Sequence, residues 1–249
     1  MRVTIPTRIR PPVLVMLLCL ESVVVLGALA LFGIAYPDRF RSRLWRNGGE
    51  EGWCSNPRLR IYFYANYEEP PEIPLIWSQR LTTSNAATAV LSLAVLFARI
   101  TIAALRYDAR WTNTAYDAVL AGLWAWSAAA QGGADLTDPE HLMPRPWYLM
   151  RGCEEAWRGN RAWCKIAKWE YGWAIMAAIF YMTKIVGTAG WMVYEKGRRD
   201  ASREGDLTEI WRGEGRRWYK DDADCSSGHD LVELTSYRSY LDLPRTTDG

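Results

Sequence analysis

The stretch from Asn85 to Gln131 constrains the fold more than any other part of the chain. It contains two mainly apolar runs, Asn85–Leu105 and Asn113–Gln131, separated by a short basic segment. A helix needs about 20 mainly apolar residues to cross the hydrocarbon core of a bilayer, and both runs come close to that length. The stretch therefore predicts two membrane-spanning helices joined by a tight turn. Since such helices are antiparallel, Arg99 in the first and Asp117 in the second are expected on the same side of the bilayer.

The polar residues of both runs recur at helical spacing, so each predicted helix carries one polar stripe. The first stripe consists of Asn85, Thr88, Ser92, Arg99 and Arg106, and the second of Asn113, Asp117, Trp124, Ser127 and Gln131. Ala121, Ala125 and Ala129 form a small-residue seam, which lets helix backbones approach closely in lipid. One polar stripe per helix indicates faces that turn into a bundle, because lipid offers such a stripe no partners.

Two further apolar runs, Val13–Tyr36 and Trp169–Tyr194, complete the pattern. The first follows a basic start and contains Ala28-Leu29-Ala30, so a cleaved signal peptide is an alternative to an uncleaved span. The run is longer than a usual signal core and holds Glu21 inside it, which favours the uncleaved span. The sequence therefore predicts an all-α fold, a four-transmembrane-helix bundle. The mean hydropathy of −0.18 hides this bundle because apolar runs and charged loops cancel in the average.

Two long connections and a polar tail lie outside these runs. Residues 37–84 are expected to form an ordered but irregular loop, in which Arg60–Tyr67 has the aromatic density of a strand. The prolines that follow end that segment. Residues 132–168 form the second long loop. Residues 195–249 mix charges of both signs with Gly and Ser, so a mostly disordered tail is predicted, with one short helix near Asp206–Trp211.

The basic residues near the ends of the runs predict the orientation of the chain. Such residues prefer the cytoplasmic side, and they gather in residues 1–12, in the turn 106–112 and directly after Tyr194. This places both termini in the cytosol and both long loops on the extracytoplasmic side of the plasma membrane or an endomembrane. The arginines between Arg39 and Arg46 conflict with this orientation, but long loops count less in the rule.

Each apolar run holds one ionisable residue well inside it: Glu21, Arg99, Asp117 and Lys184. At about 1.5 Å per residue, all four lie in the inner half of the bilayer, so two acids and two bases meet at similar depth. A buried charge is costly unless it is paired. The pattern predicts ion pairs that fix the order and rotation of the helices. The alternative is that the four residues line a path for protons or a solute, although no inverted repeat or helix break accompanies them.

The cysteines and histidines form no recognisable catalytic or metal-binding constellation. Cys153 and Cys164 face the oxidising side in this topology and could form a disulfide, while free thiols or a bond to Cys54 are the alternatives. His141 and His229 have no second ligand at zinc-like spacing, and no hydrolase, nucleotide-binding or metalloprotease motif occurs. The formal net charge of +2 gives no reason to expect nucleic acid as a partner. The chain is therefore predicted to be non-enzymatic and to need no cofactor.

The tail carries two candidate recognition elements. A basic cluster directly after the fourth run can hold anionic lipid headgroups at about 1 kcal/mol per residue. This cluster consists of Lys196, Arg198, Arg199 and Arg203. Further on, Tyr240 and Leu243 fit the Y-x-x-Φ pattern that sorting adaptors read in an extended peptide. Because such a tetrapeptide is frequent by chance, an inert chain end is the alternative.

Four predicted spans, a short intracellular turn, two extracytoplasmic loops and cytosolic ends resemble the MARVEL-like tetraspan proteins. More narrowly, the segment from Arg60 to Arg99 and the segment from Asp138 to Cys153 are similar to uncharacterised membrane proteins of filamentous fungi. The resemblance in topology implies a non-enzymatic role in membrane organisation or trafficking, with lipid, further copies of the chain or other membrane proteins as partners. The competing hypothesis is a small transporter or channel subunit that uses the intramembrane charges.

Overall fold

The structure is a computed structural model that describes residues 11–105 and 110–225. The fold of these residues is all-α, as predicted: they form helices and no strand, and one isolated β-bridge joins Asp135 and Met143. The chain divides into two compact units, Met1–Gly190 and Trp191–Gly249. Helix α7 (Arg161–Cys225) begins in the first unit and ends in the second.

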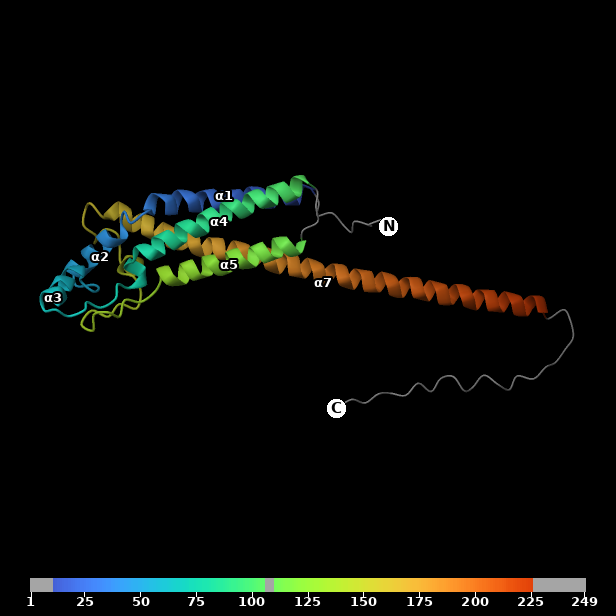
Figure 1. The fold of residues 1–249 in the computed structure, drawn as a ribbon. Helices are drawn as coiled ribbons and strands as arrows, with labels where there is room; N and C mark the ends of the chain where they lie inside the picture. The colour runs from blue at the N-terminus through green and yellow to red at the C-terminus, as the bar shows by residue number, and fades with distance from the viewer. Residues whose placement is uncertain (1–10, 106–109, 226–249) are drawn as a thin grey trace, which may run out of the picture. The chain divides into compact units, whose positions relative to one another are not determined.

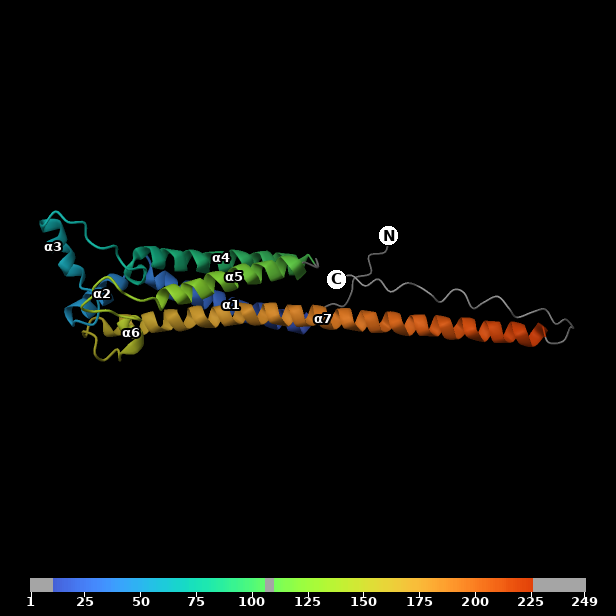
Figure 2. The same cartoon turned by 90° about the horizontal axis from the view of Figure 1, so that it is seen from below.

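Four long helices form the body of the first unit, and we call them the bundle. They are α1 (Pro11–Ala35), α4 (Gln79–Ala104), α5 (Arg110–Gln131) and the first part of α7. The helices run side by side in both views, and α4 packs against both α1 and α5 (Figures 1 and 2). Their order along the chain matches the four predicted apolar runs.

Three segments of the described residues are long and apolar enough to cross a membrane. They are Val15–Ala35, Gln79–Ala104 and Arg161–Arg203. Helix α5 does not reach the same hydropathy because polar and aromatic side chains such as Asn113, Asp117 and Trp124 interrupt its alanines. The chain is thus compatible with a membrane protein, and the fourth span remains a prediction.

Two helices begin earlier than the apolar runs predict. Helix α4 begins at Gln79 because the hydroxyl of Ser78 caps it by accepting a hydrogen bond from the Arg80 N–H. Helix α7 begins at Arg161, where the Cys164 N–H already donates to the carbonyl oxygen of Asn160. Hydropathy detects the apolar part of a helix, and it misses a polar first turn of this kind.

The prediction of a disordered tail is wrong for residues 195–225. Helix α7 continues without a break to Cys225, and the short helix expected near Asp206–Trp211 falls inside it. The segment is rich in Arg and Glu, which favour helix, and Arg199 pairs with Glu195 one turn earlier at 3.4 Å. Mixed charge does not by itself distinguish a disordered tail from a solvated helix. Residues 226–249 lie outside the described residues.

Residues 36–78 and 132–160 form a folded cap at one end of the bundle, at the left of Figure 1. It contains α2 (Arg41–Glu50), α3 (Arg60–Ala65), α6 (Trp147–Met150) and two 3-10 turns, η1 (Pro57–Leu59) and η2 (Leu75–Trp77). The expectation of an irregular first loop is therefore wrong, because helices and helical turns make up much of it. The strand-like segment is α3, since Asn56 and Pro57 start a helical turn and no partner strand lies beside it.

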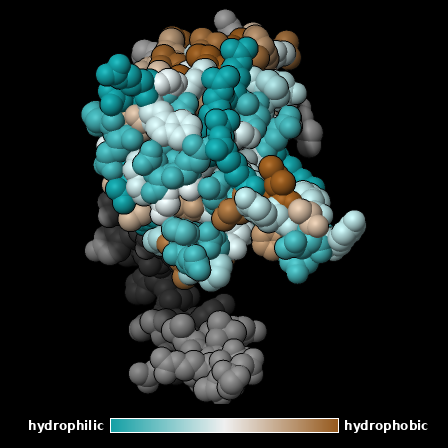
Figure 3. Space-filling view, turned by 90° about the vertical axis from the view of Figure 1, so that its left-hand side faces the viewer, coloured by the Kyte–Doolittle hydropathy of each residue, from teal (hydrophilic) through white to brown (hydrophobic). Residues whose placement is uncertain are grey.

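Each part of the first unit has its own hydrophobic core. The bundle core joins Phe32 of α1, Trp124 of α5 and Tyr181 of α7. The cap core consists of Phe40, Leu44, Trp45, Trp77, Trp147, Tyr148 and smaller buried side chains. Gly48 is required there, because a Cβ would lie only 2.5 Å from the Trp147 ring. Seen from the cap end, the surface is mainly hydrophilic, with hydrophobic residues along its upper edge (Figure 3).

Candidate functional site

The four ionisable residues of the bundle meet in one cluster, which we call the ion cluster. Arg99 of α4 donates to Glu21 Oε2 of α1 at 3.0 Å and to Asp117 Oδ1 of α5 at 2.6 Å. Lys184 Nζ of α7 lies 2.9 Å from Glu21 Oε2 and 3.0 Å from Asp117 Oδ1. Each base therefore contacts both acids, and two positive and two negative charges cancel.

The ion cluster is buried. The two carboxylate side chains are at most 4% exposed, Arg99 is 6% exposed and Lys184 is 12% exposed. Arg99 also donates to the carbonyl oxygen of Asn113 at 3.2 Å, and Lys184 Nζ lies 5.5 Å from the ring centres of Phe180 and Tyr181. An unpaired charge in such a place costs several kcal/mol, so the contacts dictate which face of each helix turns inward.

The polar stripes of α4 and α5 continue from the ion cluster toward the cap. The Trp124 indole donates to the Ser92 hydroxyl at 3.2 Å, the Ser127 hydroxyl donates to Asn85 Oδ1 at 2.8 Å, and the Gln131 amide donates to Ser127 at 3.1 Å. All five of these side chains are buried. Two of these contacts therefore join α4 to α5 inside the bundle, and the third lies within α5. Arg106, the last residue of the first predicted stripe, lies outside the described residues.

The predicted small-residue seam of α5 is only partly used inside the bundle. Ala121 is buried in the bundle core, whereas Ala125 and Ala129 are exposed. Ala121 therefore belongs to the bundle core, and the other two alanines of the seam do not. Spacing alone does not say which side of a helix meets its neighbour.

A second buried ion pair joins the cap to the bundle, and sequence reasoning missed it. Arg41 at the start of α2 lies 3.2 Å from Glu170 Oε2 of α7, with side chains 3% and 0% exposed. Arg41 also donates to the Thr82 hydroxyl of α4 at 2.9 Å and to the carbonyl oxygen of Ile76 at 3.2 Å. Glu170 lies at the start of an apolar run, on the predicted extracytoplasmic side of the bundle. The arginines of the first long loop lie on that same side, which is the signal in the sequence for a pair. Four arginines were available there, and spacing could not choose among them.

Asp135 is the centre of the polar interior of the cap. Its carboxylate is fully buried and accepts hydrogen bonds from the Ser55 hydroxyl at 2.6 Å, the Trp77 indole at 2.9 Å and the Thr137 hydroxyl at 2.7 Å. Ser55 in turn accepts from the Trp45 indole at 3.0 Å. These donors come from both long connections, so Asp135 ties them together. Nothing in its sequence surroundings distinguishes it from an ordinary loop aspartate.

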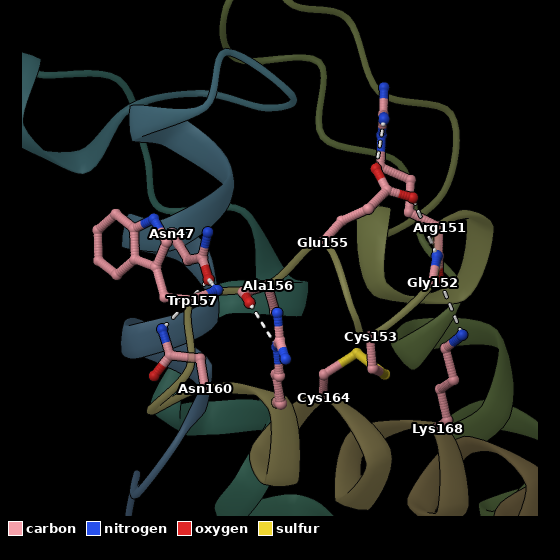
Figure 4. Close-up of a disulfide and its surroundings, with 11 residues drawn as sticks. Asn47, Arg151, Gly152, Cys153, Glu155, Ala156, Trp157, Asn160, Cys164 and Lys168 are labelled. Carbon is pink, nitrogen blue, oxygen red and sulfur yellow. Dashed lines mark hydrogen bonds and ion pairs between the residues drawn. A yellow bond between two sulfur atoms is a disulfide. The ribbon is translucent and has the colours of Figure 1, made fainter.

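Cys153 and Cys164 form a disulfide that closes the second connection onto the first turn of α7 (Figure 4). Around it, Arg151 pairs with Glu155 at 2.9 Å, and Lys168 Nζ donates to the carbonyl oxygen of Arg151 at 2.9 Å. The sequence left this pairing open among three arrangements. The structure joins these two residues and leaves Cys54 as a free, buried thiol.

The remaining candidate chemical groups of the cap are occupied or inert. Burial, with smaller contributions from Asp135 and Asp138, raises the pKa of the Cys54 thiol to about 12, so it is not a nucleophile near neutral pH. His141 pairs with Asp138 at 3.0 Å, within its own loop. Among the described residues, no three His, Cys, Asp or Glu side chains gather in a way that could hold a metal ion. His229 lies outside them.

The predicted lipid-binding residues lie on the part of α7 that belongs to the second unit. Lys196, Arg198, Arg199 and Arg203 are all exposed on this helix. Arg199 contacts Glu195, one turn earlier, while the others extend their positive charge along the helix. Tyr240 and Leu243, the predicted sorting motif, lie outside the described residues.

Comparison with known proteins adds one partial relative. No protein family and no solved structure matches the chain. The chain is similar to Kojic acid related protein 1 from Aspergillus oryzae, with 28% identity over 137 residues, or 53% of this chain. The matched region is 52% of that protein, so the chain spans about half the length of the relative.

Proposed function

We propose that this chain is a non-enzymatic integral membrane protein that organises other membrane components through its cap. In this proposal α1, α4, α5 and α7 all span the bilayer, both termini are cytosolic, and the cap lies on the extracytoplasmic side of the plasma membrane or an endomembrane. The ion cluster suits a structural role because each of its charges is paired with two others.

The observation that carries the proposal is the exposed apolar surface around α3. Ile61, Tyr62 and Tyr64 are each exposed to about two thirds, and Tyr67 is fully exposed, with a φ of 61°. Leu59 adds to the same surface. Outside the bilayer, such a gathering of large apolar side chains is typical of a site that meets a partner. The partner is another membrane protein or a second copy of this chain.

The cap that carries α3 is cross-linked to the bundle. The disulfide, the Asp135 hydrogen bonds and the Arg41–Glu170 pair connect both long connections with α7. A surface on this frame meets its partner without losing much conformational freedom, which favours binding. The exposed basic residues of α7 offer a second contact, with anionic lipid of the cytosolic leaflet.

Site-specific photo-crosslinking in cells tests this function. A photoreactive amino acid at Tyr64 is expected to give discrete crosslinked products of defined mass. The matched control is the same amino acid at Arg158, which is also exposed on the cap but lies away from α3 in the sequence. Addition of Ile61→Asp should abolish the Tyr64 products. Equal products from both positions, or none from Tyr62, Tyr64 and Tyr67, would contradict the proposal.

A small transporter or channel subunit is the second candidate, favoured by the presence of four ionisable side chains inside the bundle. Purified chain in liposomes separates the two. The scaffold proposal expects proton and solute leakage equal to that of empty liposomes, and flux that is lost with Asp117→Asn would replace it with transport.

Glycosylation tests the orientation independently. Tyr67→Asn with Glu69→Thr creates an acceptor on the cap that should be modified, while Arg245→Asn creates one in the tail that should not. The opposite result would place the cap in the cytosol.

A further inference from the structure

A cavity of about 150 Å³ lies in the cap, between the two long connections. Residues 45–71 supply most of its lining, and residues 137–139 supply the rest. Four side chains with flat or rigid rings form its apolar walls, namely Trp45, Phe63, Pro71 and Pro139. Apolar and aromatic walls with a few polar groups among them are typical of sites that bind small molecules.

The size of the cavity limits its occupant to a single ring. An engineered cavity of about 150 Å³ in another protein binds benzene. One wall of the present cavity is already fixed, because Trp45 stacks on Trp77 with ring centres 6.4 Å apart and its indole donates to Ser55. A planar ring packs well against aromatic side chains, and a preformed wall lowers the entropic cost of binding.

The acceptor groups that line the cavity are already in use. The Asp138 carboxylate accepts a hydrogen bond from the Glu140 N–H at 3.0 Å and pairs with His141 at 3.0 Å. The Thr137 hydroxyl donates to Asp135 at 2.7 Å. The acid of the cavity therefore has a basic partner within its own loop, and it does not call for a cationic ligand.

Two donor groups of the cavity are left over. Arg60 donates through Nη1 to the carbonyl oxygen of Pro71, and its guanidinium forms no ion pair within the described residues. Asn56 Oδ1 accepts from the Arg58 N–H at 2.9 Å, while its amide Nδ2 bonds to no other described residue. The cavity thus offers one uncompensated positive charge and one free amide donor. A carboxylate suits both, because a guanidinium binds it through two parallel N–H···O bonds.

The same cavity lies against the inner face of α3. Arg60 and Phe63 are three positions apart on this helix, so they share a face, and both are part-buried. Ile61, Tyr62 and Tyr64 are exposed and belong to the outer surface. An aromatic ring with a charged group can therefore contact α3 through Phe63 and Arg60 without touching the exposed apolar side chains.

We propose that this cavity binds a small ligand made of one aromatic ring and a carboxylate. The ring packs against Trp45 and Phe63, and the carboxylate accepts hydrogen bonds from the Arg60 guanidinium and the Asn56 amide. The positive charge of Arg60 selects against cationic rings, and a neutral ring leaves that charge unpaired. This inference does not rest on the proposed function, which concerns the outer surface of α3.

Fluorine NMR of para-fluorobenzoate with the full chain in detergent micelles tests the inference. Saturable binding is expected, with a dissociation constant on the order of 1 mM, which is reachable for a ligand of about ten non-hydrogen atoms. The amide para-fluorobenzamide has the same ring and no charge, so it should bind roughly tenfold more weakly. No saturable binding of para-fluorobenzoate, or equal binding of the amide, would overturn the proposal.

Two substitutions locate the binding site. Arg60→Gln removes the charge, and Asn56→Asp replaces the free donor with a negative charge while it keeps the oxygen that caps η1. Each should weaken binding by roughly tenfold, because a charge-assisted hydrogen bond is lost. Arg158→Gln is the matched control, since it removes an exposed arginine of the cap that does not line the cavity. Near-UV circular dichroism identifies the variants that fold, and unchanged affinity in either folded cavity variant would overturn the proposal.

Discussion

Removal of Arg99 is the most informative perturbation of the bundle. Its guanidinium contacts both carboxylates of the ion cluster and the carbonyl oxygen of Asn113. Loss of one partner from a buried ion pair costs about 3–5 kcal/mol, because the remaining charge stays buried. Lys184 still lies within 3.0 Å of both acids, so part of their charge remains compensated. We therefore expect Arg99→Ala to lower the free energy of unfolding by about 3 kcal/mol, at the low end of that range.

A double-mutant cycle separates pairing from packing. Arg99→Ala with Asp117→Ala leaves Glu21 and Lys184 as one neutral pair at 2.9 Å. The double variant should therefore be more stable than Arg99→Ala alone, with a coupling energy of about 2 kcal/mol between the two positions. Reversible unfolding in mixed micelles, followed by the fluorescence of the 14 tryptophans, measures all four corners of the cycle.

The control and the refuting result are defined by the same measurement. Arg58→Ala removes a base that contacts Glu50 at 2.9 Å but is 57% exposed, and exposed pairs contribute only about 0–1 kcal/mol. It should leave unfolding nearly unchanged. If Arg99→Ala resembles Arg58→Ala, or if the losses in the cycle are additive, the ion cluster does not hold the bundle together.

Three further predictions concern the cap. Glu170→Ala should destabilise the chain by about 3–5 kcal/mol, because it leaves Arg41 buried without its counter-ion, as measured by the same unfolding assay. Cys153→Ser should cost about 3 kcal/mol, as expected for a disulfide that closes a short loop, and the wild type should lose that difference under reducing conditions. The Cys54 thiol should resist alkylation at pH 8 until the chain unfolds. Because its pKa is raised from 9.0 to about 12, the folded chain favours the neutral thiol. The free energy of unfolding that depends on this thiol should therefore fall only as pH rises from about 9 to 12. Rapid labelling of the folded chain would show that Cys54 is accessible.

The sequence was informative where a pattern repeats along one helix. The recurrence of Asn85, Ser92 and Arg99 at helical spacing was enough to place them on one buried face, because helix geometry alone decides which residues share a face. Charges in separate apolar runs could be matched by depth for a similar reason. Glu21 and Lys184 are far apart in the sequence, but each lies in its own span at a depth that the run itself defines.

The sequence was uninformative where long-range packing selects one residue among equals. Arg41 differs from its neighbouring arginines only in its contact with Glu170, which is 129 positions away. Asp135 likewise receives Ser55 and Trp77 only after the two long connections have folded together. Residues 195–225 differ from the prediction for another reason. Their mixed charge and glycine content indicate disorder, whereas the helix propensity of the individual residues favours the helix that forms.

The two buried ionic contacts of α7 have a joint consequence for the cap. Glu170 and Lys184 are 14 positions apart, so they lie on nearly the same face of the helix, about 21 Å apart along its axis. Between them, packing supports α7 mainly through the small residues Ala174 and Ala177 and through Tyr181. A rotation of α7 by one residue would turn both charges away from their partners at once. Because the disulfide attaches the second connection to the first turn of the same helix, the rotation of α7 also determines the position of the cap.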